Sequence, residues 1–452
     1  MRKYFLFLSL LIFFEVVMYW ILYDPFQLTY QLGLNINLMS ICMHIGVDGL
    51  SLFFIFLVSF LIPCCLLFNW NTYVFNITEY CICLFCMECI LIFVFSVSDL
   101  LLFYLFFESV LMPMFIFIGV MGLRSRRIHA AYLLFFYTLF GSLFMLGSIL
   151  FLYLHIGATD MQFLQATEMS FERELALWLA FFLSFSIKIP MFPFHIWLPE
   201  AHVEAPTEGS VLLAGVLLKM GSYGFIRVLV TVLWNATVFF IPFVFLLSAL
   251  AIVYTSFVTI RQIDMKRIIA YSSVAHMNLS ILGLFVFNIY SLVGSVFLML
   301  GHGIVSAILF FAVGILYDRY KTRLIKYYSG LVQVMPLFSL LFLVAVLGNV
   351  SFPATCNFIG EVLIFFGLVI GNLWSVPVLF VGIFICTVYT FLMYNRIIFG
   401  FYNFGFLMKS LDLSRAEFFI LLPFCILIFL LGLAPAMLID NILFPLYGIL
   451  FI

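Results

Sequence analysis

Apolar runs of about 20 residues, long enough for an α-helix to cross the hydrocarbon core of a bilayer, follow one another along nearly all of this 452-residue chain. Only helices and closed barrels satisfy every backbone polar group in lipid. Barrel strands alternate polar and apolar residues, whereas runs such as 91–95 and 424–431 are apolar on every side. Charged residues make up only 9% of the chain, too few to cover a water-facing surface. The sequence therefore predicts an all-α polytopic membrane protein.

The apolar pattern predicts thirteen membrane elements in one transmembrane domain, residues 1–452, with no soluble domain or long linker. They lie near 4–22, 49–69, 79–97, 99–120, 130–154, 175–203, 209–232, 236–259, 268–287, 290–316, 331–371, 376–400 and 416–438. Alternating them across the membrane puts most of the 19 basic residues on one side and leaves only Arg173 in a loop on the other. This asymmetry is what the positive-inside rule requires.

Two elements are too long for one straight crossing. The 331–371 stretch could cross twice, but two crossings would move the basic loop at 401–415 to the wrong side, so we read it as one helix broken near 349–353. The 175–203 stretch contains three prolines, which remove backbone donors and break helices. Broken helices at matching places in two halves indicate a transport site at a repeat interface. We therefore expect inverted repeats, although the sequence shows no strong internal repeat.

Four of the charged residues inside these elements stand out as functional candidates, because a charge at membrane depth costs about 2.5–3.5 kcal/mol on insertion scales. Glu108 and Lys219 lie within their spans, Lys188 lies at the first predicted break, and Glu361 lies just beyond the second. Burial disfavours a charged lysine and a nearby carboxylate favours it, so such groups can load and release protons. Each residue also has a structural alternative. For Glu108 it is pairing with a lysine, and for Lys219 it is a static ion pair. For Lys188 it is snorkelling to the interface, and for Glu361 it is capping of a helix.

Histidines form a second tier of candidates, because imidazole titrates near neutrality and can relay protons. His302 lies between two glycines, His276 lies in an Ala-Tyr-Ser-Ser-Val-Ala-His run, and His195 lies beside the first break. The alternative for each is a buried histidine whose hydrogen bonds are simply satisfied. The pattern as a whole predicts proton transfer through Glu108, Lys188, Lys219, Glu361, His302, His276 and His195.

Other chemistries find little support in the sequence. The chain has no Walker A loop, no dinucleotide fingerprint and no H-E-x-x-H motif. Cysteines 81, 83, 86 and 89 imitate an iron–sulfur spacing, but they lie in an apolar stretch rather than a loop, which favours packing residues over cluster ligands. With a net charge of −1, no basic surface for nucleic acid is expected. We expect no cofactor and no metal in this chain.

The run Ser186-Ile-Lys-Ile-Pro-Met-Phe-Pro-Phe-His-Ile-Trp-Leu-Pro-Glu-Ala-His-Val-Glu-Ala-Pro-Thr207, followed by Val211-Leu-Leu-Ala-Gly-Val-Leu-Leu-Lys-Met-Gly221, resembles the chain 4 family of NADH:ubiquinone oxidoreductase, respiratory complex I. Residues 269–277 and Gly301-His302 resemble the same family. The resemblance implies an antiporter-like subunit of the membrane arm, with its core at about 79–400 and two interrupted helices. Glu108 would be the family's key glutamate, Lys188 the lysine of the first broken helix, Lys219 the central lysine and Glu361 the ionisable residue of the second.

The same resemblance implies a proton-translocating function coupled to electron transfer in partner subunits, which would hold NADH, FMN, iron–sulfur clusters and ubiquinone. Expected partners are other membrane-arm subunits, neighbouring antiporter-like subunits among them, and membrane lipids. The alternatives are a stand-alone or Mrp-type cation/proton antiporter subunit and a structural scaffold of the membrane arm. The 61 phenylalanines, which need T-rich codons, favour the mitochondrial inner membrane over a bacterial cytoplasmic membrane.

The chain departs from this family at two points. The family usually has fourteen spans, and one fewer is predicted here, with a single span before Asp48. Glu208 stands where the family usually has a small residue, and the two alternatives for it are a charge at the rim and a residue that perturbs the local break.

Overall fold

The computed structural model describes residues 2–27, 30–38, 41–70, 77–122, 124–403, 405 and 411–450. The main helices are α1 (Arg2–Leu22), α2 (Gly49–Phe68), α3 (Ile77–Ser96), α4 (Leu100–Ser109), α5 (Leu111–Gly119), α6 (Arg127–Ile156), α7 (Met161–Gln165), α8 (Phe171–Lys188), α9 (Trp197–Glu204), α10 (Thr207–Leu212), α11 (Leu218–Gly224), α12 (Trp234–Ile260), α13 (Met265–Leu284), α14 (Ile289–Tyr320), α15 (Pro336–Asn349), α16 (Cys356–Gly371), α17 (Val376–Ile398), α18 (Arg415–Leu433) and α19 (Ala436–Leu450). Two π-helical segments, η1 (Leu213–Leu217) and η2 (Phe225–Val230), flank α11, and short 3-10 turns occur at Ile325–Tyr327, Leu331–Gln333 and Leu373–Ser375.

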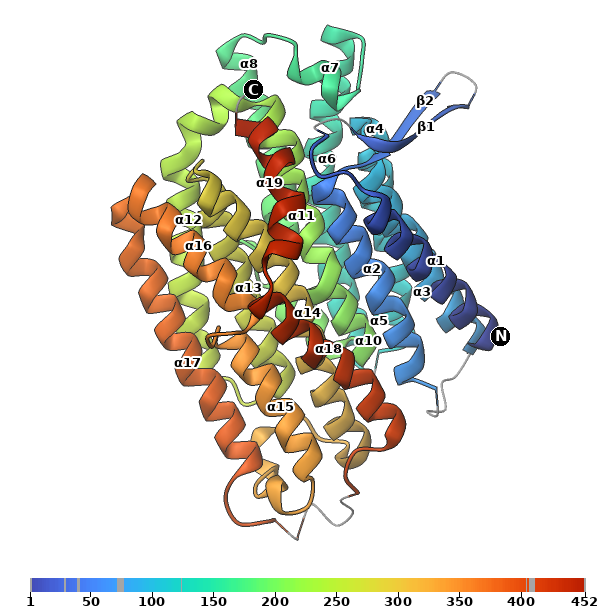
Figure 1. The fold of residues 1–452 in the computed structure, drawn as a ribbon, viewed down its shortest axis with the longest axis vertical. Helices are drawn as coiled ribbons and strands as arrows, with labels where there is room; N and C mark the ends of the chain where they lie inside the picture. Colours follow the sequence, from blue (N-terminus) through green and yellow to red (C-terminus); the bar gives the residue numbers. More distant parts are fainter. Residues whose placement is uncertain are drawn as a thin grey trace.

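The long helices lie side by side along the long axis of the molecule (Figure 1). Two of them form its centre: α14 and the continuous helical segment 207–230 are buried along their apolar length. Helix α14 packs against α2, α10, α13, α15, α16, α18 and α19. The middle of the bundle is therefore shielded from the surroundings by a full layer of other helices.

Every predicted membrane element has a helical counterpart. Among the described residues, ten helices are long and apolar enough to cross a membrane. The predicted elements outside that set, 175–203, 268–287 and 331–371, correspond to α8 with α9, to α13, and to α15 with α16. The prediction of a helical polytopic membrane protein is confirmed.

Both long elements are broken where the prolines predict. Helix α8 ends at Lys188 and α9 begins at Trp197, with Pro190 and Pro193 between them. In the second break, Ser351 and Ala354 have φ of 60° and 74°, in the left-handed region that helices of L-residues do not use. Figure 1 places α15 low and α16 high in the bundle, as expected for two halves of one crossing.

Three features of the chain differ from the prediction. Strands β1 (Gln31–Leu38) and β2 (Ile41–Val47) form an antiparallel hairpin at the upper end of the molecule (Figure 1). The alternation of apolar and polar residues over 32–38 is typical of a strand and is the signal that a search for long apolar runs overlooks. The short helix α7 was also not predicted.

The third difference is the last span, predicted at 416–438. Helix α18 ends at Leu433, because Ala434 precedes a proline and such residues avoid the helical region. Helix α19 then continues towards the upper end, where the C-terminus lies (Figure 1). The prediction was therefore wrong about where this helix stops and lacked α19; Lys409, one of the basic residues assigned to the preceding loop, lies outside the described residues.

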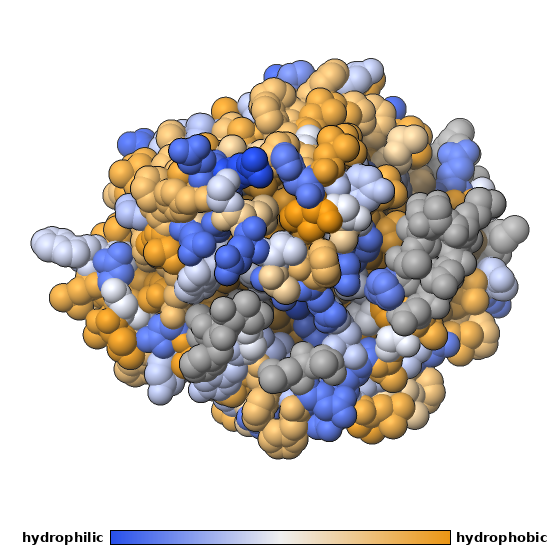
Figure 2. Space-filling model, turned by 90° about the horizontal axis from the view of Figure 1, so that it is seen from above, coloured by the Kyte–Doolittle hydropathy of each residue, from blue (hydrophilic) through white to orange (hydrophobic). Residues whose placement is uncertain are grey.

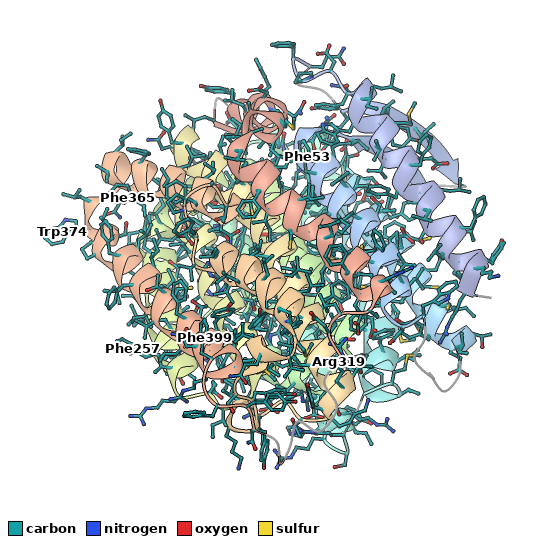
Figure 3. The ribbon with its side chains drawn as sticks, turned by 60° about the horizontal axis from the view of Figure 1, so that its bottom comes forward. Phe53, Phe257, Arg319, Phe365, Trp374 and Phe399 are labelled. Atoms are coloured by element: carbon teal, nitrogen blue, oxygen red, sulfur yellow. The ribbon has the colours of Figure 1, made fainter. Side chains whose placement is uncertain are left out.

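The sides of the bundle present apolar side chains, as a surface facing hydrocarbon should. One face of α12 exposes large side chains spaced three or four residues apart, at Phe239, Phe243, Leu246, Leu250, Tyr254 and Phe257. Phe257 and Trp374 project outward from the bundle in Figure 3. The upper end face instead gathers hydrophilic residues inside an apolar rim (Figure 2). The sides of the bundle and its upper end therefore differ in polarity.

The second break depends on a close backbone contact with α18. A Cβ added at Gly432 would overlap the carbonyl group of Ala354. We expect Gly432→Ala to lower the free energy of unfolding by about 1–3 kcal/mol, the usual cost of overpacking, measured by thermal denaturation of the detergent-purified protein. The matched control is Gly147→Ala in α6, where no atom lies within 4 Å of the added methyl group. Equal melting temperatures for the two variants would contradict this account of the break.

Candidate functional site

Lys219 lies at the centre of the buried segment 207–230, in the α-helical stretch between two π-helical segments. Its side chain is fully buried, and the ammonium group donates to the carbonyl oxygen of Ala214 in η1. π-Helical segments are rare and occur frequently at functional sites. The local widening of this helix therefore provides a carbonyl partner for a fully buried lysine.

A histidine of the neighbouring helix is the second partner of Lys219. His302 Nδ1 on α14 lies 3.0 Å from Lys219 Nζ. Glycines allow the helices to approach this closely: a Cβ at Gly303 would lie 3.1 Å from the carbonyl oxygen of Gly215, and one at Gly301 would lie 2.7 Å from Asn357 Oδ1. The glycines on both sides of His302, noted in the sequence, thus have a packing role.

The line of ionisable groups continues from His302 to Glu361. The imidazole rings of His302 and His276 have centroids 5.7 Å apart. His276 Nδ1 on α13 lies 3.5 Å from Glu361 Oε1 on α16, and both side chains are buried. The structure therefore brings together Lys219, His302, His276 and Glu361 from four different helices in one buried line, which we call the central line.

Glu361 can reach this line because α16 packs directly on the backbone of α14. A Cβ at Gly360 would lie 2.8 Å from the backbone nitrogen of Leu298, so a larger residue there would push α16 away. Beside Glu361 and His276 is a cavity of about 20 Å³. Such a cavity has room for about one water molecule. The far end of the central line is thus tightly packed but not completely filled.

Glu108 and Lys188 form a second pair of candidates. Glu108 lies next to the junction of α4 and α5 at Val110, an interruption that was not predicted and that follows from Pro113, whose missing N–H cannot bond the carbonyl of residue 109. Glu108 interacts with Ser142 of α6 and electrostatically with Lys188. The regular helix is therefore interrupted next to the residue that carries the carboxyl group.

Glu108 and Lys188 do not form a direct ion pair. No ion pair within 4.0 Å joins them among the ion pairs of the described residues. Instead the Lys188 ammonium donates to the carbonyl oxygen of Phe107 at 3.3 Å and lies 4.2 Å from the centre of the Phe107 ring. Desolvating an ion pair is costly, and a carbonyl together with an aromatic face solvates the ammonium at close range.

The first break brings Lys188 next to the helix that carries Lys219. A Cβ at Gly221 would lie 3.2 Å from Lys188 Cβ and closer still to Ile189. The two lysines thus belong to segments that pack directly against each other at Gly221, but their ammonium groups have separate partners.

His195 is buried beside the first break but is not part of the central line. Its ring packs against Phe192 and Tyr254, with centroids 5.9 and 5.4 Å away. Its Nδ1 atom has no hydrogen-bond partner among the described residues. None of the described contacts joins His195 to Lys188, so the structure does not group it with the other six candidates.

Two basic residues that the sequence analysis assigned to loops are in fact buried. Lys266 donates to the carbonyl oxygen of Ala205 at 2.9 Å and to Ser210 Oγ at 3.2 Å. Arg323 donates to the carbonyl oxygen of Val203. These carbonyls lie at the C-terminal end of α9, where cations are favourable because the last helical carbonyls lack partners. Loop position gave no sign of this burial.

The buried cations have acidic neighbours. Lys266 interacts electrostatically with Glu208 and Glu204. Glu208 is fully buried; its carboxyl group contacts Thr207 but neither oxygen makes a full hydrogen bond. Glu208 is therefore a buried carboxyl group and not a charge at an exposed rim. A cavity of about 440 Å³ at the lower end reaches Glu204 and is lined by Arg124, Arg126, Arg261 and Arg267, among other residues.

A buried ion pair at the C-terminal end of the helical segment 207–230 was also not predicted. Arg227 in η2 pairs with Asp48, the residue that caps α2, and donates to the Tyr223 hydroxyl at 3.1 Å. The sequence shows the arginine two turns beyond Lys219 but not its partner, which lies 179 positions away. This pair anchors the upper end of the central helix.

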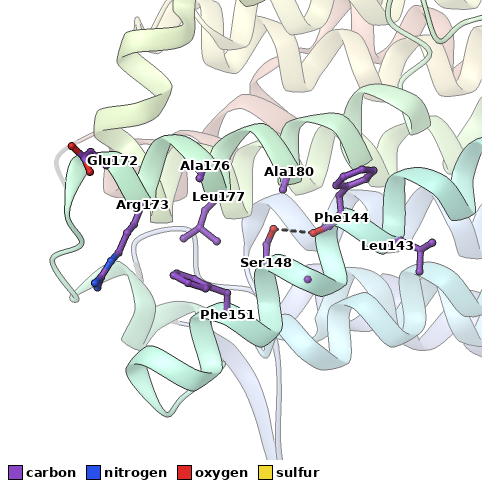
Figure 4. A pocket seen from close by; sticks show the side chains of 10 residues that line it. Leu143, Phe144, Ser148, Phe151, Glu172, Arg173, Ala176, Leu177 and Ala180 are labelled. Carbon is purple, nitrogen blue, oxygen red and sulfur yellow. Dashed lines mark hydrogen bonds between the residues drawn. The ribbon is translucent and has the colours of Figure 1, made fainter.

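A surface groove of about 500 Å³ between α6 and α8 lies apart from these residues (Figure 4). Apolar side chains line most of it, with Glu172 and Arg173 near one end. Among the described residues, no group of three or more His, Cys, Asp or Glu side chains could hold a metal ion. The chemistry of the site is that of carboxyl, ammonium and imidazole groups within the bundle.

Known proteins share both the sequence and the fold. Residues 97–387 match the family model described as NADH:quinone oxidoreductase/Mrp antiporter, TM. NADH-ubiquinone oxidoreductase chain 4 of Acanthamoeba castellanii is 48% identical over 99% of this chain and 91% of its own length. A chain of respiratory complex I from Thermus thermophilus superposes with a TM-score of 0.90 at 26% identity, covering 100% of this chain and 95% of that one.

A chain of the Mrp complex from Dietzia sp. DQ12-45-1b also superposes, with a TM-score of 0.89 over 99% of this chain and 92% of that one, but at 16% identity, which shows a common fold alone. The sequence identity therefore distinguishes the chain 4 proteins from the Mrp complex, whereas the similarity of fold does not. By its identity over nearly the full length, the chain belongs to the NADH-ubiquinone oxidoreductase chain 4 family.

Proposed function

We propose that this chain is a proton-translocating subunit of the membrane arm of respiratory complex I and that the central line is its proton route. The observation that carries the proposal is the chain of contacts from Lys219 through His302 and His276 to Glu361. All four groups are buried. Ionisable residues inside membrane helices mark proton relays, because their cost must be offset by function.

The two ends of the central line have complementary chemistry. A charged Lys219 and a charged Glu361 become two neutral groups when one proton moves from the ammonium to the carboxylate. In a region of low dielectric both states can be populated, because the attraction of the charged pair opposes the cost of desolvating it. A small electrostatic change nearby is then enough to shift the proton along the line.

The two imidazoles carry the proton between these ends. His302 accepts from Lys219 at Nδ1, the nitrogen 3.0 Å away. No hydrogen bond joins the two rings among the described contacts, so a water molecule or a ring rotation completes the step from His302 to His276. His276 then exchanges with Glu361 across 3.5 Å. Histidine suits this task because an imidazole ring gains and loses a proton near neutral pH.

Glu108 and Lys188 supply the change that drives the transfer. Lys188 is held by Phe107 and interacts with Glu108 without contacting its carboxylate. Ionising Glu108 draws the ammonium away from the Phe107 ring, and protonating it releases the lysine. Since Lys188 contacts the helix of Lys219 at Gly221, either movement changes the field at Lys219. His195 has no step in this route, because no described contact links it to the other residues.

Membership in the family supports the remaining parts of the proposal. The redox groups (NADH, FMN, iron–sulfur clusters and ubiquinone) belong to partner subunits, and this chain holds none of them. Its partners are other membrane-arm subunits, neighbouring antiporter-like subunits and lipids, in the mitochondrial inner membrane. The translocating core spans residues 79–400 and is built from inverted repeats that each contain one broken helix.

The 48% identity to a chain 4 protein favours this proposal over a stand-alone antiporter, because the Mrp complex resembles the chain only in fold. A purely structural scaffold is disfavoured by the geometry. A scaffold needs no titratable partner for a buried cation, yet Lys219 has an imidazole beside its carbonyl partner and, among the described residues, no carboxylate that would make a static ion pair.

Replacing Lys219 by alanine removes the first donor of the central line. We expect complexes that carry Lys219→Ala to assemble and to lose NADH-driven proton pumping by roughly 10²-fold, the scale of a lost general acid–base group. Pumping is measured in reconstituted vesicles and normalised to assembled complex. Lys326→Ala, at an exposed position, is the control and keeps the native rate. A Lys219→Ala complex that assembles and pumps normally would refute the route.

Replacing Glu108 by glutamine keeps the size of the side chain and its contact with Ser142 but removes its charge. We expect Glu108→Gln to lower the pumping rate by at least about tenfold, because Lys188 no longer has a carboxylate that can draw it from Phe107. Glu15→Gln, on the exposed face of α1, controls for the loss of an acidic residue. Native pumping with Glu108→Gln would show that the driving step lies elsewhere.

A further inference from the structure

Cys386 of α17 is buried next to the central line and has no role in the route described above. Its sulfur lies 3.5 Å from His276 Nε2, and its thiol donates to the carbonyl oxygen of Asn349 at 3.4 Å. The Tyr389 hydroxyl donates to the same sulfur at 3.1 Å. One thiol thus contacts a relay histidine, a tyrosine and the end of the second broken helix.

We propose that Cys386 is a positioning residue that determines which nitrogen of His276 exchanges protons. The inference rests on the proposed function, because it assigns a role within the central line. The thiol has one hydrogen, and it donates that hydrogen in its hydrogen bond to the carbonyl oxygen of Asn349. The sulfur therefore acts as an acceptor towards the imidazole, and the proton of neutral His276 resides on Nε2.

This tautomer leaves the lone pair of His276 on Nδ1, the nitrogen 3.5 Å from Glu361. A proton that arrives at the ring can then bind only on the side that faces the carboxyl group. The second nitrogen of a functional histidine commonly determines the tautomer in this way. The groups that face His276 are Glu361 from α16, His302 from α14, and Cys386 with Tyr389 from α17.

The contact with Asn349 joins this function to the broken helix. Asn349 is the last residue of α15, and the final carbonyls of a helix have no partner inside it. Cys386 satisfies one of them and also holds the imidazole. A movement of the second break therefore changes the hydrogen bond that fixes the His276 tautomer.

The test compares Cys386→Ala, Cys386→Ser and Cys425→Ala in the assembled complex, with the proton-pumping rate followed as a function of pH. Cys425 is the matched control, because it is buried in α18 and has no described hydrogen bond. Without an acceptor at Nε2, protonated His276 loses a hydrogen bond to a charged group, which shifts its titration by about one pH unit. We expect Cys386→Ala to lower the pumping rate about tenfold and to move the alkaline limb of the profile to lower pH.

Serine keeps one donor and one acceptor, so Cys386→Ser should retain at least about half of the pumping rate, and Cys425→Ala should match the native complex. A Cys386→Ala complex with the native rate and pH profile would overturn the inference, and so would one whose only defect is a lower amount of assembled complex. A serine variant as impaired as the alanine variant would overturn it as well.

Glu361→Gln, measured in parallel, separates this inference from the proposed function. If Glu361→Gln abolishes pumping while Cys386→Ala behaves like the native complex, the role of Cys386 is wrong and the route stands. If Glu361→Gln pumps normally, the route itself is wrong, and the role of Cys386 falls with it.

Discussion

Hydrocarbon offers no water to a charge, so each ionisable group that this chain carries into the bilayer has to be solvated by the protein itself. Much of the internal architecture follows from that requirement. The π-helical segment next to Lys219 supplies a carbonyl partner, and the glycines beside His302 bring an imidazole within 3.0 Å. Lys266 and Arg323 occupy the open C-terminal end of α9. Irregular backbone is tolerated at membrane depth only where protein or water surrounds it. In this chain the irregular segments lie next to the buried charged groups.

The same constraint explains why charged residues and helix breaks occur together. Lys188 ends α8, Glu108 lies at the junction of α4 and α5, and Glu361 follows the break between α15 and α16. An unbroken helix has no free carbonyl to offer a buried cation, whereas a helix end has several. Each break is therefore both a source of hydrogen-bond partners and a place where the backbone can move. On the proposed route, proton transfer and conformational change therefore involve the same residues.

Much of the fold could be predicted because its signals are local. Apolar length located the spans, prolines located both long breaks, and a charge within an apolar run singled out Glu108, Lys188, Lys219 and Glu361. The hairpin at 31–47 and helix α19 were missed because they are too short for a search based on spanning length, and the Val110 interruption because a single proline in a helix often only kinks it.

The contacts of the site were harder to predict, since they join residues far apart in the chain. Lys219 meets His302 and Arg227 meets Asp48 only after folding. Nothing local distinguishes the buried Lys266 and Arg323 from exposed loop residues, and nothing marks Cys386 among the other cysteines in apolar helices. The sequence singled out the candidate ionisable residues, but their order in space depends on how the glycines let α14 approach its neighbours.

The central claim is that protons pass along the line from Lys219 to Glu361, and His302 is the residue in that line that contacts the lysine. The most direct test is the NADH-driven proton-pumping rate of reconstituted complex that carries His302→Gln, with His155→Gln at an exposed position as the control. Glutamine keeps a polar side chain next to Lys219 but cannot be protonated at neutral pH. The account predicts normal assembly and pumping reduced by at least about tenfold. A His302→Gln complex that pumps at the native rate would contradict it.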